Sequence, residues 1–216
     1  MYKRQEVDIP KIQWYPGHIA KAEKKLSEVI NKVDLVIEVR DARIPLSTGH
    51  PHLNKWINNK KHILVINRIA KKRVVDSARK AGVTRNLRWI KLESGIDLLD
   101  APGVIPPNLE DQKSALNLAL CDDIGEAAYE IESVAIGFIK IISTLNKDKN
   151  ANISVKQISN RYGVDIAKGF KSPSAWMNEA ASKHTSGDIR RMSHKLLEDY
   201  RNQMLGKIAL EVPLWN

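Results

Sequence analysis

Two short apolar runs, both rich in β-branched residues, constrain the fold of this 216-residue sequence more than any other feature. They are VDLVIEV at 33–39 and HILVIN at 62–67. Runs of this length and composition are typical of strands that are covered on both faces of a sheet. A loop rich in Pro, Gly, Ser and Thr and a short predicted helix at 52–58 separate them. The sequence therefore predicts a strand–helix–strand unit, with a parallel sheet and a right-handed crossover.

Other elements are expected on both sides of this unit. An amphipathic helix is predicted at 18–31, and two further strands at 87–92 and 97–99 are joined through Ser94-Gly95. From Asp111 onward the hydrophobic period is helical, with apolar stripes over 126–142 and over 188–204, the latter capped near Gly206. The predicted fold class is α/β, with a parallel-sheet domain followed by an all-α domain. The predicted boundary lies near Ile105-Pro106-Pro107.

Charge is distributed unevenly along the chain. Residues 1–104 carry the whole formal net charge of +10, and the stretch 68–91 alone carries +8. Such a local field attracts polyphosphate or nucleic acid, although a solvated loop without a partner is the alternative. Within this stretch, Arg73, Arg79 and Lys80 are the expected RNA contacts.

The cysteine content and the lack of a long apolar run predict where in the cell the chain acts. The single cysteine, Cys121, excludes a disulfide framework and fits a reducing environment. No apolar run follows the charged N-terminus, and no stretch approaches the roughly 20 apolar residues of a membrane span. We expect a cytoplasmic monomer without membrane contact.

The tetrapeptide Asp100-Ala101-Pro102-Gly103 follows a predicted strand, at the place where doubly wound folds put ligand contacts. A carboxylate in this position can hold Mg²⁺ through water, and a glycine N–H can approach a terminal phosphate. The alternative is a strand that simply ends in a Pro-Gly turn.

Three further residues are candidates for nucleotide chemistry. Asn67 ends the second apolar run, where a guanine-binding loop has the form N-K-x-D, but Arg68, Ile69 and Ala70 follow and the aspartate is missing. Thr84 could close over a metal through its hydroxyl, or it could be an ordinary β-turn threonine. His18, in the first turn of a helix after Pro16-Gly17, could present an imidazole to a reaction centre, or could be a surface or capping residue.

Together these motifs resemble the circularly permuted ribosome biogenesis GTPase A family (YlqF type). The resemblance covers nearly the whole chain from Ile12. The matching segments are WYPGH at 14–18, DLVIEVRDARIPLST at 34–48, ILVIN at 63–67, AGVTR at 81–85 and LLDAPGV at 98–104. It implies an incomplete Ras-like, circularly permuted GTP-binding domain over 1–107 and a helical, ribosome- and RNA-binding domain over 108–216.

The resemblance also implies roles for individual residues. His18 would act in catalysis, since Val104 cannot orient water as the glutamine of many small GTPases does. Mg²⁺ would be held by Thr84 and Asp100. GTP would be bound by Asn67, Arg68, Thr84, Asp100 and Gly103. The implied partner is the large ribosomal subunit with its rRNA. On the last helix Arg190, Arg191, Lys195 and Arg201 fit RNA contact, and a solvated face explains them equally well.

The chain departs from this family at one place. A G-x-P-N-V-G-K-S phosphate loop should lie between Asn67 and Thr84, but only positions 68–83 remain there. A strand, loop and helix do not fit, because a βαβ unit takes roughly 30 residues. We hypothesise a deletion, or an error of sequence assembly, across the tripeptide Ile66-Asn67-Arg68. The sheet would then lack its central strand and expose edges and apolar faces.

Three interpretations follow. The first is a ribosome-assembly GTPase whose catalysis is impaired by the missing phosphate loop. The second is a non-catalytic RNA- or ribosome-binding remnant. The third is a product that folds poorly.

Overall fold

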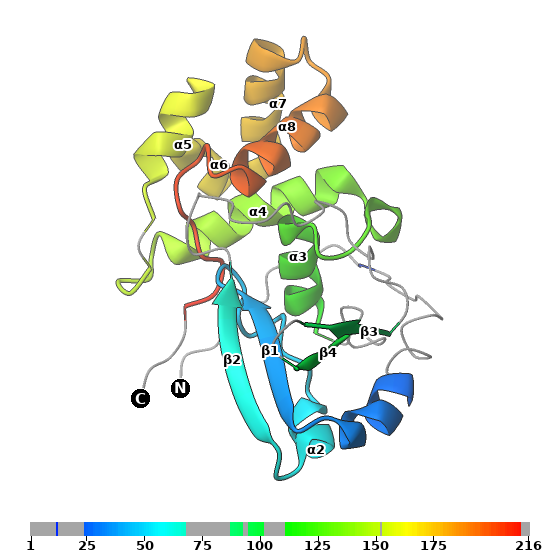
Figure 1. Ribbon diagram of the computed structural model, residues 1–216. Helices are drawn as coiled ribbons and strands as arrows, with labels where there is room; N and C mark the ends of the chain where they lie inside the picture. Colours follow the sequence, from blue (N-terminus) through cyan, green and yellow to red (C-terminus); the bar gives the residue numbers. More distant parts are fainter. Residues whose placement is uncertain are drawn as a thin grey trace.

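The computed structural model describes residues 12, 24–67, 87–92, 95–101, 111–151 and 153–212. Strands dominate the first part of the described chain, and helices make up the part from Gln112 onward (Figure 1). The predicted α/β class with a small parallel sheet and a helical C-terminal region is therefore confirmed. The predicted boundary at 105–107 lies outside the described residues.

The strand–helix–strand unit forms as predicted. Strand β1 (Leu35–Asp41) and strand β2 (Lys61–Asn67) pair in parallel, with helix α2 (Leu53–Ile57) between them along the chain. The register runs from Leu35 beside Lys61 to Asp41 beside Asn67. Beyond the last pair, the Ala42 N–H donates to the Asn67 carbonyl at 2.9 Å and fixes the start of the following loop.

The helix predicted at 18–31 is described only in its second half. Residues 24–29 are helical and continue into the 3₁₀ helix η1 (Ile30–Lys32), whereas 18–23 lie outside the described residues.

The two other predicted strands form a hairpin. Strand β3 (Arg88–Lys91) pairs antiparallel with strand β4 (Asp97–Asp100), and Gly95 takes the positive φ of +73° that the connection requires. Among the described residues this hairpin does not join the β1–β2 pair, so the strands form two separate two-stranded sheets.

The C-terminal region consists of helices, and side chains cap α3, α6, α7 and α8 at their N-termini. Aspartate or serine side chains at residues 111, 165, 172 and 188 accept hydrogen bonds from first-turn N–H groups. The elements are α3 (Gln112–Cys121), η2 (Glu126–Ala128), α4 (Ile131–Leu145), α5 (Val155–Tyr162), α6 (Ile166–Lys171), α7 (Pro173–His184) and α8 (Ile189–Arg201). The expected cap near Gly206 is wrong: α8 ends at Arg201, and Gln203 takes the left-handed φ of +60° that follows.

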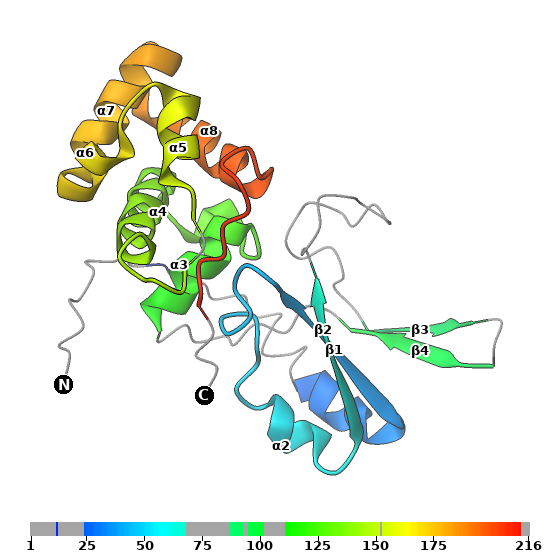
Figure 2. The same cartoon turned by 90° about the vertical axis from the view of Figure 1, so that its left-hand side faces the viewer.

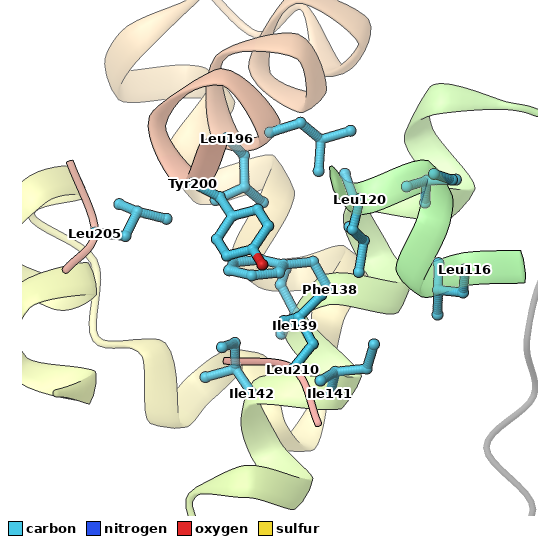
Figure 3. Packing of buried hydrophobic residues seen from close by; sticks show 14 of the residues in the cluster. Leu116, Leu120, Phe138, Ile139, Ile141, Ile142, Leu196, Tyr200, Leu205 and Leu210 are labelled. Atoms are coloured by element: carbon cyan, nitrogen blue, oxygen red, sulfur yellow. The ribbon is translucent and has the colours of Figure 1, made fainter. Parts of the chain in front are cut away.

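The hydrophobic core belongs to the helical region. Phe138 of α4 stacks on Tyr200 of α8 with ring centroids 5.0 Å apart. Around them lie side chains from α3, α4, α8 and the C-terminal tail (Figure 3), namely Leu116, Leu120, Ile139, Ile142, Leu196, Leu205 and Leu210. Of these core residues, Phe138, Ile139, Ile142, Leu196 and Tyr200 lie within the predicted helical stripes, and the chain from Gln112 onward is helical where described, which confirms the predicted change to a helical period.

The predicted burial of the strands is wrong. Every residue of β2 is exposed, and β1 contributes only Glu38 and Asp41 to the buried set. The reason is that the described residues supply just two strands here and no second helical layer. Among the described helices, none combines the length and apolar character that crossing a membrane requires.

Candidate functional site

The structure describes fewer than half of the residues that the sequence singled out. Asn67, Asp100, Arg190, Arg191 and Lys195 are described. The predictions for His18, Arg68, Arg73, Arg79, Lys80, Thr84 and Gly103 lie outside the described residues.

Asn67 lies where a ligand contact was expected. It ends β2 at the carboxyl edge of the parallel pair, directly beside Asp41, which ends β1. Asn67 is exposed, whereas Asp41 is buried. The carboxyl edge of a parallel sheet is the usual ligand edge of an open α/β fold.

Asp100 ends β4, in the other sheet. It pairs with Arg88 across the hairpin and is half-buried. The described residues therefore do not bring Asp100 and Asn67 into one sheet. Asp100 also belongs to no group of three potential metal ligands within the described ranges. The described residues therefore do not by themselves fit a Mg²⁺ ion at Asp100, and Thr84, the other predicted ligand, lies outside the described residues.

The loop after β1 contains a buried ion pair that the sequence analysis did not single out. Arg43 donates from Nε at 3.0 Å and from Nη2 at 2.7 Å to the two carboxylate oxygens of Asp41. Nη2 also donates to the Cys121 carbonyl at 3.1 Å, and the guanidinium lies 5.6 Å from the centre of the Tyr200 ring. Burial alone would lower the pKa of Arg43, but hydrogen bonding to Asp41 raises it above its ordinary value, so the guanidinium stays charged.

A second buried cluster fixes the same loop to the C-terminal tail. The Glu211 carboxylate accepts from the backbone N–H of Leu46 at 2.6 Å and of Ser47 at 3.1 Å, and from the Ser47 hydroxyl. Asn117 of α3 donates its Nδ2 to Glu211 at 3.0 Å. Residues 41–48, which we call the docking loop, are thus held by α3, α8 and the tail. Because Ala42 also binds the Asn67 carbonyl, the docking loop connects the ligand edge to the helical region.

One group of side chains near the docking loop has the composition of a metal site. Asp41, Cys121 and Asp123 offer ligand atoms that all lie within 4.8 Å of one another. However, Arg43 already occupies both oxygens of Asp41. Burial also raises the pKa of the Cys121 thiol to about 12, so it stays protonated. The group therefore serves the packing of the docking loop.

A small cavity adjoins this contact. It has a volume of about 200 Å³ and lies between Arg43 of the docking loop, Tyr200 and Gln203 at the end of α8, and Lys207 of the tail. Ligand pockets usually begin at roughly 300 Å³, so this one is small for a nucleotide.

The basic residues of α8 differ in their surroundings. Arg190 and Arg191 are exposed. Lys195 lies with Nζ 3.9 Å from Asp199, which also accepts from Arg161 at 2.8 Å. Arg201 donates to the Ala119 and Leu120 carbonyls at 2.8 and 3.1 Å, so it satisfies the C-terminal end of α3. The Arg201 guanidinium is thus engaged inside the protein, whereas RNA contact by this residue stays a prediction.

The fold and the carboxyl-edge asparagine define an α/β protein whose small parallel sheet is docked on a helical region. No protein-family model matches the chain. It is similar over 94% of its length to Ribosome biogenesis GTPase A of Bacillus cereus, with 23% identity and 94% of that protein covered. A shorter segment of 57 residues, 26% of the chain and 18% of the relative, is 46% identical to Mitochondrial ribosome-associated GTPase 1 of Mus musculus. The resemblance to the ribosome biogenesis GTPase A family is confirmed by these relatives.

Among solved structures, GNP-bound YlqF from T. maritima matches 90% of this chain and 99% of its own, with a TM-score of 0.48 and 17% identity. The alignment with the B. cereus protein extends over 286 positions, more than the 216 residues of this chain. That relative therefore carries residues that have no counterpart here.

Proposed function

We propose that this chain is a ribosome-assembly GTPase by descent, acting in maturation of the large ribosomal subunit, and that it holds GTP weakly. The observation that carries the proposal is the alignment over 94% of the chain with a protein named Ribosome biogenesis GTPase A. Its place of action is the cytoplasm, where we expect it to be a monomer.

The proposed nucleotide site surrounds the carboxyl ends of β2 and β4. Asn67 and Arg68 border the guanine base, while Thr84, Asp100 and Gly103 border the terminal phosphate and Mg²⁺. The position of Asn67 at the ligand edge, beside Asp41, supports this assignment. His18 acts as the water-orienting group, since the Val104 side chain has neither a hydrogen-bond donor nor an acceptor.

Weak binding follows from the absence of the phosphate-loop block. Backbone N–H groups and a lysine of that loop stabilise the β- and γ-phosphate charge in such enzymes, and charge-assisted hydrogen bonds contribute about 1.5–3 kcal/mol each. The separation of the described strands into two pairs supports the loss, because the block would lie between β2 and β3. The alignment with the B. cereus relative spans 286 positions although this chain has 216 residues, which agrees with the loss of a block.

The RNA contact is proposed for the basic stretch 68–91 and for Arg190, Arg191 and Lys195. The exposure of Arg190 and Arg191 supports this role. A second candidate function, a non-catalytic ribosome-binding remnant, is favoured by the separation of the sheet, since RNA contact needs the surface and not the phosphate loop.

Two measurements test the proposal. Titration of a fluorescent GTP analogue with Mg²⁺ should give weak binding that Asn67→Ala abolishes, while the B. cereus relative binds tightly as the control. Co-sedimentation with purified ribosomal subunits should place the chain on the large subunit. Ribosome binding without any GTP binding supports the remnant instead. Tight GTP binding with turnover contradicts the loss of the phosphate loop, and no ribosome binding contradicts both candidates.

A further inference from the structure

One face of the β1–β2 pair is apolar and open. Side chains alternate along a strand, so the register puts Leu35, Ile37 and Val39 of β1 on the same face as Ile63 and Val65 of β2. Each of these five side chains is between 40% and 57% exposed. A contiguous apolar surface of this kind is unusual in a monomer and marks a place where something binds.

The opposite face of the same pair is mixed, because it carries the exposed Leu64 and Ile66 beside a polar cluster around Glu38. There Glu38 is buried and accepts from Arg40 Nε at 2.7 Å, and His62 Nε2 lies 3.1 Å from the Glu38 carboxylate. Arg40 also donates to the carbonyl of Pro45 in the docking loop at 3.1 Å. The two faces therefore differ in chemistry, because only the opposite face carries a buried carboxylate with hydrogen-bonded polar neighbours.

The hairpin adds a second open element. Trp89 of β3 and Leu98 of β4 are 50% and 41% exposed. In both views the hairpin lies beside the β1–β2 pair (Figures 1 and 2), yet no strand pairing joins them in the described chain. Two-stranded sheets are marginal by themselves, and a third strand with a packed face is what stabilises them.

We propose that the apolar face of the β1–β2 pair, with the edges that pair with no further strand in the described chain, receives a polypeptide with one apolar strand and one amphipathic helix. This occupant has the chemistry of the block that is missing between Asn67 and Thr84. The inference rests on the proposed function. Two observations support it. In the described chain, no strand pairing joins the sheet before that position to the sheet after it, and the B. cereus relative carries residues that have no counterpart in this chain. A second copy of this chain could cover the apolar face, but its described strands already belong to two-stranded sheets.

The test uses the full 216-residue chain without nucleotide. The probe is the segment of the B. cereus protein that aligns between Asn67 and Thr84, produced on a solubility tag and labelled for fluorescence anisotropy. Saturable 1:1 binding is expected. The double variant Ile37→Lys with Val65→Lys should weaken it by tenfold or more, because charges would enter the apolar contact. Both side chains are exposed, so the variant should fold, and circular dichroism checks this.

The matched control is Met204→Lys, since Met204 is also an exposed apolar side chain, at 44%, but lies beyond α8. It should bind like the unmodified chain. No binding of the probe, or equal binding by all variants, overturns the proposal. A homodimer that the double variant dissociates, together with no probe binding, overturns it in favour of a second copy. Because the readout needs neither GTP nor ribosomes, its failure is distinct from failure of the proposed function.

Discussion

The Glu211 carboxylate accepts a 3.1 Å hydrogen bond from the backbone N–H of Ser47, a residue 164 positions earlier in the chain. The same tail donates from Leu210 N–H to the Arg43 carbonyl at 2.8 Å. The tail therefore lies along the docking loop and is hydrogen-bonded to Arg43, Leu46 and Ser47 of that loop. Since the docking loop also binds the Asn67 carbonyl through Ala42, the ligand edge depends on residues near the end of the described chain.

Replacing Glu211 with alanine should lower the free energy of unfolding by about 3 kcal/mol, because two backbone N–H groups and Asn117 lose their acceptor in a buried place. Urea denaturation measures the change. Glu198→Ala, at an exposed position of α8, is the control and should change stability by less than about 0.5 kcal/mol. Equal effects of the two substitutions would show that the tail does not hold the docking loop.

Arg43→Ala should be at least as damaging, by about 3–5 kcal/mol, because it leaves the buried Asp41 carboxylate without its partner. Arg43→Lys keeps the charge but loses the bidentate contact with Asp41, so it should be more stable than Arg43→Ala and less stable than the unmodified chain. The exposed Arg190→Ala is the matched control. Full stability of Arg43→Lys in thermal and urea unfolding would mean that charge, and not geometry, holds the loop.

The strands were predictable and their burial was not. Local composition fixes β-branched runs as strands, and β1 and β2 begin and end within two residues of the predicted limits. Burial depends on which other elements cover a strand, and no local pattern carries that information. The same holds for the caps: Asp188 is a local signal that starts α8, whereas its end after Arg201 is decided by packing.

The site residues also divide into those with a local sequence signal and those placed by contacts distant in sequence. Asn67 and Asp100 follow apolar runs, so their places at strand ends could be predicted. The partners of the docking loop could not, because Glu211 and Asn117 lie far away in sequence and carry no local motif. The segment Asp41-Ala42-Arg43 belongs to one of the motifs that carry the family resemblance, but only the structure shows that the Arg43 guanidinium binds the Asp41 carboxylate.

The buried thiol of Cys121 predicts an alkaline loss of stability. Burial raises its pKa from 9.0 to about 12, so between these values the unfolded chain releases a proton that the folded chain keeps. The free energy of unfolding should therefore fall above pH 9, by about 1.4 kcal/mol per pH unit from this group. In Cys121→Ser the fall should begin only near pH 10, where the tyrosines of the unfolded chain ionise.

A chemical readout checks the same thiol independently. In the folded protein at pH 8, a disulfide reagent such as dithionitrobenzoate should label Cys121 at least 100-fold more slowly than in urea, because the residue is fully buried and protonated. Rapid labelling of the folded chain, or an unchanged pH profile in the Cys121→Ser variant, would contradict the burial of this side chain.

Substitutions of the α8 arginines should distinguish residues that contact RNA from residues that stabilise the fold. Reversing the charge of the exposed pair, Arg190→Glu with Arg191→Glu, should weaken binding to ribosomal RNA by about tenfold or more. It should also reduce the slope of log affinity against log salt by about one for each lost phosphate contact. Arg201→Ala should leave that slope unchanged but lower stability by about 2 kcal/mol, because the Ala119 and Leu120 carbonyls lose their donor. Filter binding at several salt concentrations and urea unfolding give the two readouts. A charge-reversed pair that binds RNA as the unmodified chain does would assign both arginines to an ordinary solvated surface.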